Sequence, residues 1–283
     1  MGTETGKLHI VATPIGNLSD MSPRAVETLK ECDIIAAEDT RNTIRLLNHF
    51  DIRTPMESYH EYNKYDKAED LAAKMRAGKN VAIVTDAGTP CVSDPGEVLV
   101  ARCAEEGIPV TSIPGPSAVI TALTLSGLST RRFLFEGFLP AKKQKKERAA
   151  ALERLKNSVV TMIVYEAPHH LKETLKDLAE VLGADRRVSL CREMTKIHEE
   201  VIRTTLGEAA ETEPRGEYVL VIEGRNEEEV LSQKQAEFSE ISIEEHMQQY
   251  LDRGIAKKEA MKLVAADRGV ARRDIYNYLA GKE

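Results

Sequence analysis

Short, mostly apolar runs alternate with segments of helical period along most of this 283-residue chain. The first block contains candidate strands at residues 8–12, 34–37, 81–85 and 109–113, with helices predicted at 23–31, 68–77 and 95–106. Because these runs do not alternate between apolar and polar residues, we expect both faces of each strand to be covered. Buried strands separated by helices predict an α/β fold with a parallel sheet.

A second α/β block is predicted after residue 117. It begins with a mostly apolar helix at 118–128, which lacks a polar face and should therefore be buried between layers or domains. Strands are predicted at 133–135, 159–165, 188–191, 201–204 and 218–223, and helices at 145–156 and 171–182.

The composition changes near residue 225, where the chain becomes acidic and poor in apolar residues. This change predicts a linker over 226–240. Three short helices should follow, the last two at 256–266 and 271–279, joined by a turn that contains Gly269; this is the helix-turn-helix pattern. We therefore predict an N-terminal α/β domain at 1–116, a second α/β domain at 117–225, the acidic linker, and a helical tail at 241–283.

Charge and cysteine spacing exclude several classes of protein. The net charge of −7 argues against binding a polyanion through the overall field. Four distant cysteines without a C-x-x-C pair indicate reduced thiols and neither a zinc ribbon nor a disulfide framework. Residues 1–7 lack the apolar run of a signal peptide, and prolines interrupt the longest uncharged stretch, 107–130. We expect a cytoplasmic protein with no membrane contact.

The loops after the first-block strands are the candidate binding site, because ligands bind beyond the carboxyl ends of parallel strands. The first loop, T-P-I-G-N at 13–17, is neither a G-x-G-x-x-G fingerprint nor a phosphate-binding P-loop, which disfavours dinucleotides and nucleoside triphosphates; a simple turn remains open. The loop at 86–96 holds two glycines and two prolines in eleven residues. We interpret it as a rigid loop that a ligand approaches closely.

Charged side chains follow the strand at 34–37. Asp39 or Thr40 could cap the next helix while Arg41 pairs with an acid, or Glu38 and Asp39 could act in catalysis; both roles could hold together. Ser117, before the apolar helix, lacks the G-x-S-x-G context of a nucleophile. It is predicted to cap the helix or to contact a ligand.

Two motifs of the second block are less informative. The adjacent histidines of Y-E-A-P-H-H, residues 165–170, form a poor metal pair, and we predict no metal site. The mixed charges of R-E-M-T-K, residues 192–196, could be functional or could be a solvated strand end.

Two basic surfaces suggest a nucleic acid. Residues 131–156 hold nine basic and three acidic residues, and this island could follow a phosphate backbone, although a solvated helix start is the ordinary alternative. The second surface lies in the helix-turn-helix segment. The candidate RNA-binding residues are Lys142, Lys143, Lys145, Lys146, Lys257, Lys258, Arg272 and Arg273.

Taken in order, five loop motifs resemble the tetrapyrrole methylase superfamily. They are V-A-T-P-I-G-N-L at 11–18, A-E-D-T-R at 37–41, T-D-A-G-T-P at 85–90, S-D-P-G at 93–96 and P-G-P-S-A at 114–118. The usual G-x-G-P-G and G-D-P sequences are replaced here by T-P-I-G-N and D-A-G-T-P. These replacements are similar to those of the branch that 2′-O-methylates a cytidine of 16S ribosomal RNA in the decoding region.

The resemblance implies two α/β domains with S-adenosylmethionine in the cleft between them, usually in a homodimer. Carried over by position, the donor should contact Pro14, Asp86, Gly88, Thr89, Val92, Ser93, Ser117, Ala118, Tyr165, Glu166 and Met194. We expect Asp39 or Glu38 to accept the proton of the ribose hydroxyl, with Arg41 orienting the carboxylate or gripping a phosphate, and Lys196 as a further candidate. Two rivals remain: a methyltransferase acting on a porphyrinoid, and a non-catalytic RNA-binding assembly module.

Overall fold

The computed structural model describes residues 5–281, apart from the side chains of residues 229, 233 and 234. Within this range the chain divides into an α/β unit of residues 5–156 and 161–223, and a helical unit of residues 157–160 and 224–281. Two short parts of the chain lie outside the described residues. They are residues 1–4, which belong to the segment predicted to lack a signal peptide, and residues 282–283, at the end of the predicted tail.

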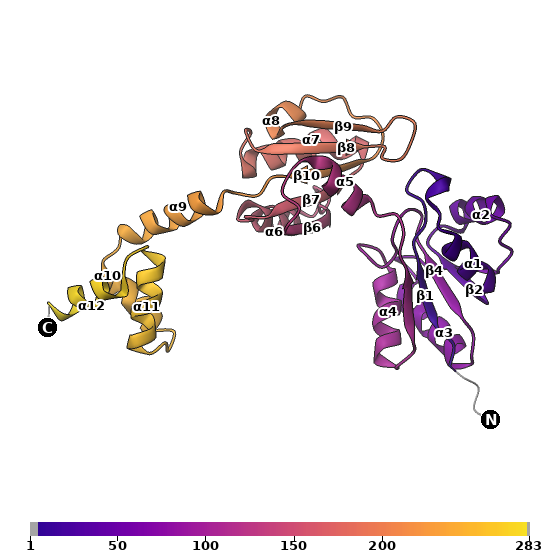
Figure 1. Ribbon diagram of the computed structural model, residues 1–283, viewed down its shortest axis with the longest axis horizontal. Helices are drawn as coiled ribbons and strands as arrows, with labels where there is room; N and C mark the ends of the chain where they lie inside the picture. The colour runs from indigo at the N-terminus through magenta and orange to yellow at the C-terminus, as the bar shows by residue number, and fades with distance from the viewer. Residues whose placement is uncertain (1–4, 282–283) are drawn as a thin grey trace. The chain divides into compact units, whose positions relative to one another are not determined.

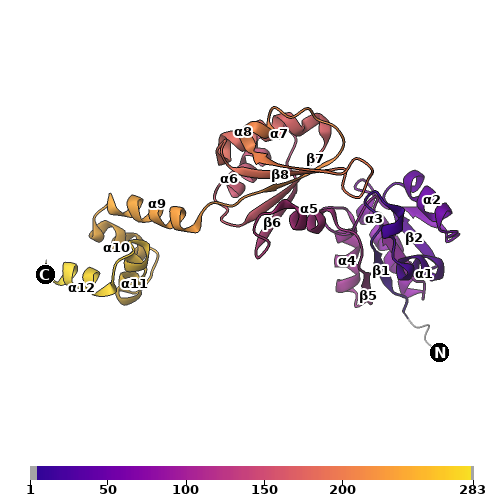
Figure 2. The same cartoon turned by 45° about the horizontal axis from the view of Figure 1, so that its top comes forward.

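Parallel strands form the first sheet of the α/β unit (Figures 1 and 2), in the order β3-β2-β4-β1-β5. Leu8 of β1 lies opposite both Val81 of β4 and Val110 of β5. The strands are β1 (Leu8–Val11), β2 (Ile34–Ala37), β3 (Met56–Ser58), β4 (Val81–Val84) and β5 (Val110–Ile113). The parallel sheet is confirmed, and the four strands predicted for it end within one residue of the predicted positions.

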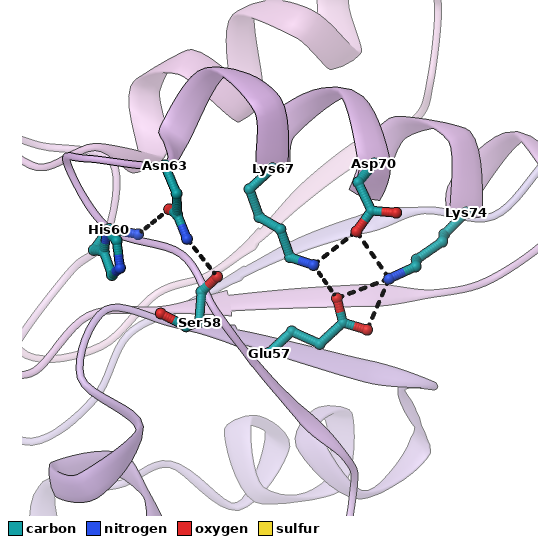
Figure 3. A network of polar contacts seen from close by, with 7 residues as sticks. All are labelled: Glu57, Ser58, His60, Asn63, Lys67, Asp70 and Lys74. Atoms are coloured by element: carbon teal, nitrogen blue, oxygen red, sulfur yellow. Dashed lines mark hydrogen bonds and ion pairs between the residues drawn. The ribbon is translucent and has the colours of Figure 1, made fainter.

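Strand β3 is the edge strand that the sequence patterns do not predict. It is short and polar, and side chains of the following helix hold it in place (Figure 3). The carboxylate of Glu57 lies 2.5 Å from the ammonium of Lys67 and 2.7 Å from that of Lys74, and Asp70 bonds both lysines. Strands are usually recognised in a sequence by a run of apolar residues. Because ion pairs hold β3 in place, its sequence lacks that pattern.

Four helices cover the two faces of the first sheet. They are α1 (Pro23–Glu31), α2 (Thr40–His49), α3 (Lys64–Arg76) and α4 (Gly96–Glu105), with a 3₁₀ turn η1 (Leu18–Asp20). Ala25 and Leu29 of α1 and Leu47 of α2 are buried on one face, and α3 and α4 contribute to the core on the other. As predicted, Ser22 caps α1: its hydroxyl accepts a hydrogen bond from the backbone N–H of Ala25 at 3.1 Å.

The second sheet is mixed, in the order β6-β7-β10-β8-β9. Strand β6 pairs parallel with β7, whereas β10 is antiparallel to both β7 and β8, and β8 is antiparallel to β9. The strands are β6 (Phe133–Phe138), β7 (Thr161–Glu166), β8 (Arg187–Arg192), β9 (Glu200–Thr205) and β10 (Tyr218–Ile222). The helices are α5 (Ala118–Ser126), α6 (Lys145–Lys156), α7 (Pro168–Leu182) and α8 (Leu206–Ala209).

The apolar helix α5 is buried on one face, whereas Ile120 is 49% exposed, so the predicted burial between layers or domains is only partly observed. Val119, Ala122 and Leu123 pack against Ile163 of β7 and Val221 of β10. Helices α6 and α7 contribute Leu155, Leu171 and Leu175 to a separate core. Among the described residues, no helix has the length and apolar character needed to span a bilayer.

The helical unit departs from the prediction at the segment expected to be an acidic linker, because residues 227–239 form a helix. The helices of this unit are α9 (Glu227–Ser239), α10 (Ile243–Leu251), α11 (Lys257–Asp267) and α12 (Arg272–Ala280). Asn226 caps α9 by accepting a hydrogen bond from the Glu228 N–H at 2.8 Å, and no glycine or proline interrupts the segment. The three helices and the four-residue turn before α12 match the prediction, whereas the domain boundaries at 116, 225 and 240 remain predictions.

Candidate active site

Backbone hydrogen bonds tie the loop after β1 to the loop after β4. The Thr13 N–H donates to the Gly88 carbonyl at 2.9 Å, and the Gly88 N–H donates to the Thr13 carbonyl at 3.1 Å. The Thr13 hydroxyl also donates to the Thr85 carbonyl at 3.2 Å. Gly88 has a φ of +86°, and a Cβ there would lie 3.2 Å from Cγ2 of Ile15. Both the positive φ and this close contact favour a glycine where the two loops meet.

Asp94 holds the loop after β4 in its shape. Its carboxylate accepts hydrogen bonds from the backbone N–H of Cys91 at 2.8 Å and of Gly96 at 2.7 Å. Burial raises the pKa of Asp94 in spite of these two bonds. Cys91 and Ser93 have φ values of +67° and +60°, in a region that L-residues rarely adopt. Such strain is typical of functional loops.

The loop before α5 is joined to the same structure, because the Thr89 hydroxyl donates to the Pro116 carbonyl at 3.0 Å. Ser117 occupies the N-cap position of α5, as predicted. Its side chain makes no capping hydrogen bond among the described residues, so the prediction that the Ser117 side chain caps the helix is wrong. The side chain instead lines the cavity described below.

The two acidic residues after β2 have different environments. Asp39 caps α2, accepting a hydrogen bond from the Arg41 N–H at 2.8 Å, and pairs with both Nε and Nη2 of Arg41 at 3.1 and 2.7 Å. These bonds lower the pKa of Asp39 to about 2. Glu38 instead accepts a hydrogen bond from the Thr85 hydroxyl at 2.8 Å. The predicted capping by Asp39 and pairing of Arg41 are confirmed.

Lys196 lies in the connection between β8 and β9, where Glu193 and Thr195 also have positive φ values. The Lys196 ammonium lies 3.1 Å from Glu193 Oε1 and 3.0 Å from Glu217 Oε2. Burial opposes its charge, but these hydrogen bonds outweigh burial and raise the pKa of Lys196. A Cβ on Gly16 would lie 2.5 Å from Cγ of Lys196, so this connection contacts the loop after β1.

A cavity of about 770 Å³ lies where these loops meet. Its size falls within the range of small-molecule sites. The predicted donor-binding residues that line it are Asp86, Gly88, Thr89, Val92, Ser93, Ser117, Ala118, Tyr165, Glu166 and Met194. Glu38 and Lys196 also line it, but Asp39 and Arg41 are absent from its described lining. Pro14 lines a neighbouring cavity of about 350 Å³.

The candidate RNA-binding residues gather within each unit separately. Lys142 pairs with Glu173 at 2.5 Å, while Lys143, Lys145 and Lys146 are exposed near the start of α6. In the helical unit the exposed cations stand at the first turns of two helices: Lys257 and Lys258 on α11, and Arg272 and Arg273 on α12.

Comparison with known proteins identifies the fold and the family. The family model of the tetrapyrrole (corrin/porphyrin) methylases matches residues 7–210. This chain belongs to the tetrapyrrole methylase family. The resemblance drawn from the five loop motifs is therefore confirmed.

Curated relatives resemble this tetrapyrrole methylase along nearly its whole length. It is 49% identical to the ribosomal RNA small subunit methyltransferase I of Halalkalibacterium halodurans, over 97% of this chain and 94% of that protein. It is 46% identical to the protein of the same name from Synechocystis, over 96% of each. The structure of uroporphyrin-III C-methyltransferase from Thermus thermophilus complexed with S-adenosyl homocysteine aligns with a TM-score of 0.55 at 20% identity, covering 77% of this chain and 97% of that chain.

One wall of the cavity in this tetrapyrrole methylase consists of residues that no sequence motif predicted. Phe133, Phe135 and Phe138 of β6 stand there beside Tyr165 of β7. The ring centroid of Tyr165 lies 4.9 Å from that of Phe135 and 5.4 Å from that of Phe138, and burial raises the pKa of Tyr165. The two-residue spacing of Phe133 and Phe135, which places both on one face of a strand, was the available signal. Ile15, Glu193 and Glu217 also line the cavity, although none of the three was assigned to the donor.

Proposed function

We propose that this protein transfers a methyl group from S-adenosylmethionine to the 2′-oxygen of a cytidine in the 16S RNA of the small ribosomal subunit. The observation that carries the reaction class and the RNA substrate is the near-complete match to proteins named ribosomal RNA small subunit methyltransferase I, at 49% and 46% identity. The choice of a cytidine 2′-oxygen rests on the resemblance of the loops T-P-I-G-N and D-A-G-T-P to those of the branch that 2′-O-methylates a cytidine of 16S ribosomal RNA.

The larger cavity fits the donor. S-adenosylmethionine supplies, when bound, a methyl group on a positively charged sulfur. The aromatic rings of Phe135 and Tyr165 offer an apolar wall, and the carboxylate of Asp86 favours a cation and can accept hydrogen bonds from ribose hydroxyls. At Gly88 the missing side chain leaves the backbone open to close approach. We assign donor binding to the predicted residues that line this cavity.

Glu38 is our candidate for the general base. A base that accepts the proton of the ribose hydroxyl contributes roughly 10²–10⁴-fold in rate. Asp39 is a poor choice, because Arg41 occupies both of its oxygens and holds its pKa at about 2. Lys196 stays protonated between its two glutamates, so it can donate hydrogen bonds but cannot accept a proton. Glu38 lines the cavity, and its carboxylate accepts a hydrogen bond from the Thr85 hydroxyl.

The basic groups of α6, α11 and α12 would contact the RNA backbone outside the active site. These residues are exposed. Because the overall net charge of −7 does not attract a polyanion, RNA would be bound through such local basic patches. We further propose that the protein works as a homodimer in the cytoplasm, where ribosomal subunits are assembled.

Mass spectrometry of 16S RNA from cells with and without the gene tests the function. We expect one cytidine to lose a methyl group when the gene is deleted and to regain it when the gene is restored. Calorimetry with S-adenosylmethionine separates the rivals, since an assembly module would not bind the donor. A porphyrinoid methyltransferase would bind the donor but leave the RNA unchanged, and either result would contradict the proposal.

A further inference from the structure

A second cavity of about 350 Å³ adjoins the larger one. Its wall combines the loop after β1, one face of α2 and the connection that carries Lys196. The residues on its wall are Thr13, Pro14, Ile15, Gly16, Leu18, Asn42, Thr43, Arg45, Leu46, Thr85, Asp86, Ala87, Lys196 and Glu217. We call it the α2 groove. The donor assignment needs none of its α2 residues.

The α2 groove and the larger cavity share a wall. Ile15, Thr85, Asp86, Ala87, Lys196 and Glu217 line both. The Thr85 hydroxyl, at this shared wall, donates to the carboxylate of Glu38 at 2.8 Å. A hydroxyl that reaches the shared wall from the α2 groove would therefore arrive beside the candidate base. This arrangement suits a reaction in which two substrates meet.

The α2 groove carries one cation that no acidic side chain neutralises. Asn42, Arg45 and Leu46 are spaced three and four residues apart, so they share one face of α2. Arg45 is exposed, and within the described part of the chain it has no ion-pair partner. By contrast Arg41, one turn earlier, is paired with Asp39.

The acids of the α2 groove are already engaged. Asp86 accepts hydrogen bonds from the Asp39 N–H at 3.3 Å and from the side-chain amide of Asn42 at 3.1 Å. Glu217 pairs with Lys196 at 3.0 Å. The guanidinium of Arg45 is thus the charge left for a ligand, and guanidinium groups bind phosphate oxygens in a two-pronged geometry.

We propose that the α2 groove binds the acceptor strand of the RNA, with Arg45 holding a phosphodiester next to the ribose that is methylated. The exposed side chain of Leu18, at the same groove, offers an apolar surface to a base. This inference rests on the proposed function. It gives α2 the role of positioning the acceptor, while the larger cavity holds the donor.

The test compares Arg45→Glu with Arg53→Glu. Arg53 is the control because it is an exposed arginine in the segment between α2 and β3, paired with Asp51, and absent from the described linings of both cavities. Methyl transfer would be measured on small ribosomal subunits from cells that lack the protein. We expect kcat/KM to fall about tenfold or more for Arg45→Glu, as for the loss of a charged hydrogen bond, and to change little for Arg53→Glu.

Three further readouts separate a binding role from a structural one. The slope of log affinity for the subunits against log salt should become shallower by about 0.7 in Arg45→Ala, the value for one phosphate contact on a single strand. Arg45→Lys should recover part of the affinity, because it keeps the charge without the fork. In the Arg45 variants, the dissociation constant for S-adenosylmethionine and the midpoint of thermal unfolding should match those of the wild type.

Equal rates and equal salt slopes for Arg45→Glu and Arg53→Glu would overturn the inference while the proposed function stands. A wild-type protein that binds the subunits but does not methylate them would overturn the proposed function. In that case the binding measurements alone would decide whether the α2 groove holds RNA.

Discussion

The two sheets of the α/β unit contribute different things to the active site. Loops of the first, parallel sheet are bonded to one another through Thr13, Gly88 and Thr89, and they carry the carboxylates of Glu38 and Asp86. The second, mixed sheet contributes an aromatic wall from β6 and β7. Under the proposed function, the first sheet would supply the candidate base and a fixed loop geometry, whereas the second would supply contact area for the ligands.

The largest effect should come from removing the candidate base. In Glu38→Gln the side chain keeps its size and can still accept the hydrogen bond from Thr85, but it cannot take up a proton. We expect kcat to fall roughly 10²–10⁴-fold with unchanged donor affinity. Single-turnover methyl transfer and calorimetry would measure the two quantities. In the control, Asp39→Asn, most of the rate should remain; a loss as large as that of Glu38→Gln would make Asp39 the better base.

Replacing Gly88 tests whether the first-sheet loops need their rigid joint. Both Gly88 and Gly107 have positive φ values, but a Cβ on Gly107 would meet no atom within 4 Å. Gly107→Ala should lower the free energy of unfolding by about 1–2 kcal/mol through backbone strain alone. Gly88→Ala should lose about 1 kcal/mol more, because its Cβ crowds Ile15. Urea unfolding would measure both, and equal losses would mean that the contact with Ile15 is unimportant.

Truncating Phe138 tests the role assigned to the second sheet. Its side chain is 59% exposed, so Phe138→Ala removes part of the cavity wall with little loss of core packing. We expect the donor or the RNA to bind about 3- to 10-fold more weakly, as for loss of a stacking or apolar contact, with kcat nearly unchanged. Tyr62→Ala is the control, since Tyr62 is 97% exposed and absent from the described linings of both cavities. A fall in kcat without weaker binding would contradict the role of ligand contact that we give to the second sheet.

The smallest effect should be a pH dependence of stability at the first sheet. Arg41 lowers the pKa of Asp39 to about 2, so the carboxylate stabilises the folded state above its unfolded pKa near 3.8. This contribution is lost as the pH falls from about 4 towards 2. The difference in urea midpoint between the wild type and Asp39→Asn should be constant from pH 8 to 5 and should shrink below pH 4. If the difference in urea midpoint stays constant down to pH 3, the ion pair between Asp39 and Arg41 is not the cause of that difference.

Local patterns predicted the first sheet well because a parallel α/β unit is built from neighbouring segments. Strands β1, β2, β4 and β5 are short apolar runs with helices between them, and the loops that follow them carry turn residues. The same patterns failed for β3, where Glu57 and its lysines replace apolar contacts, and for α9, where acidic composition resembled a linker.

Pairing between distant segments could not be predicted. Strand β10 lies between β7 and β8, and no local feature of residues 218–222 indicates that position. For the same reason the partners of Lys196 were unforeseen, since Glu217 is 21 residues away. The choice between Glu38 and Asp39 as the candidate base also required the three-dimensional structure. Adjacent acids are alike in sequence and differ only in the groups that contact them.

The strained residues Cys91, Ser93, Glu193 and Thr195 have a consequence for how this protein can be engineered. Glycine in place of Cys91 or Ser93 would relax the backbone and could raise thermostability without adding a contact, whereas Glu193→Gly would also remove the ion pair with Lys196. The four strained residues lie in two loops beside the larger cavity, however, and a relaxed loop would hold a ligand there less firmly. Selection for heat resistance alone should therefore produce slower enzymes through these positions, whereas selection for turnover should preserve the strain.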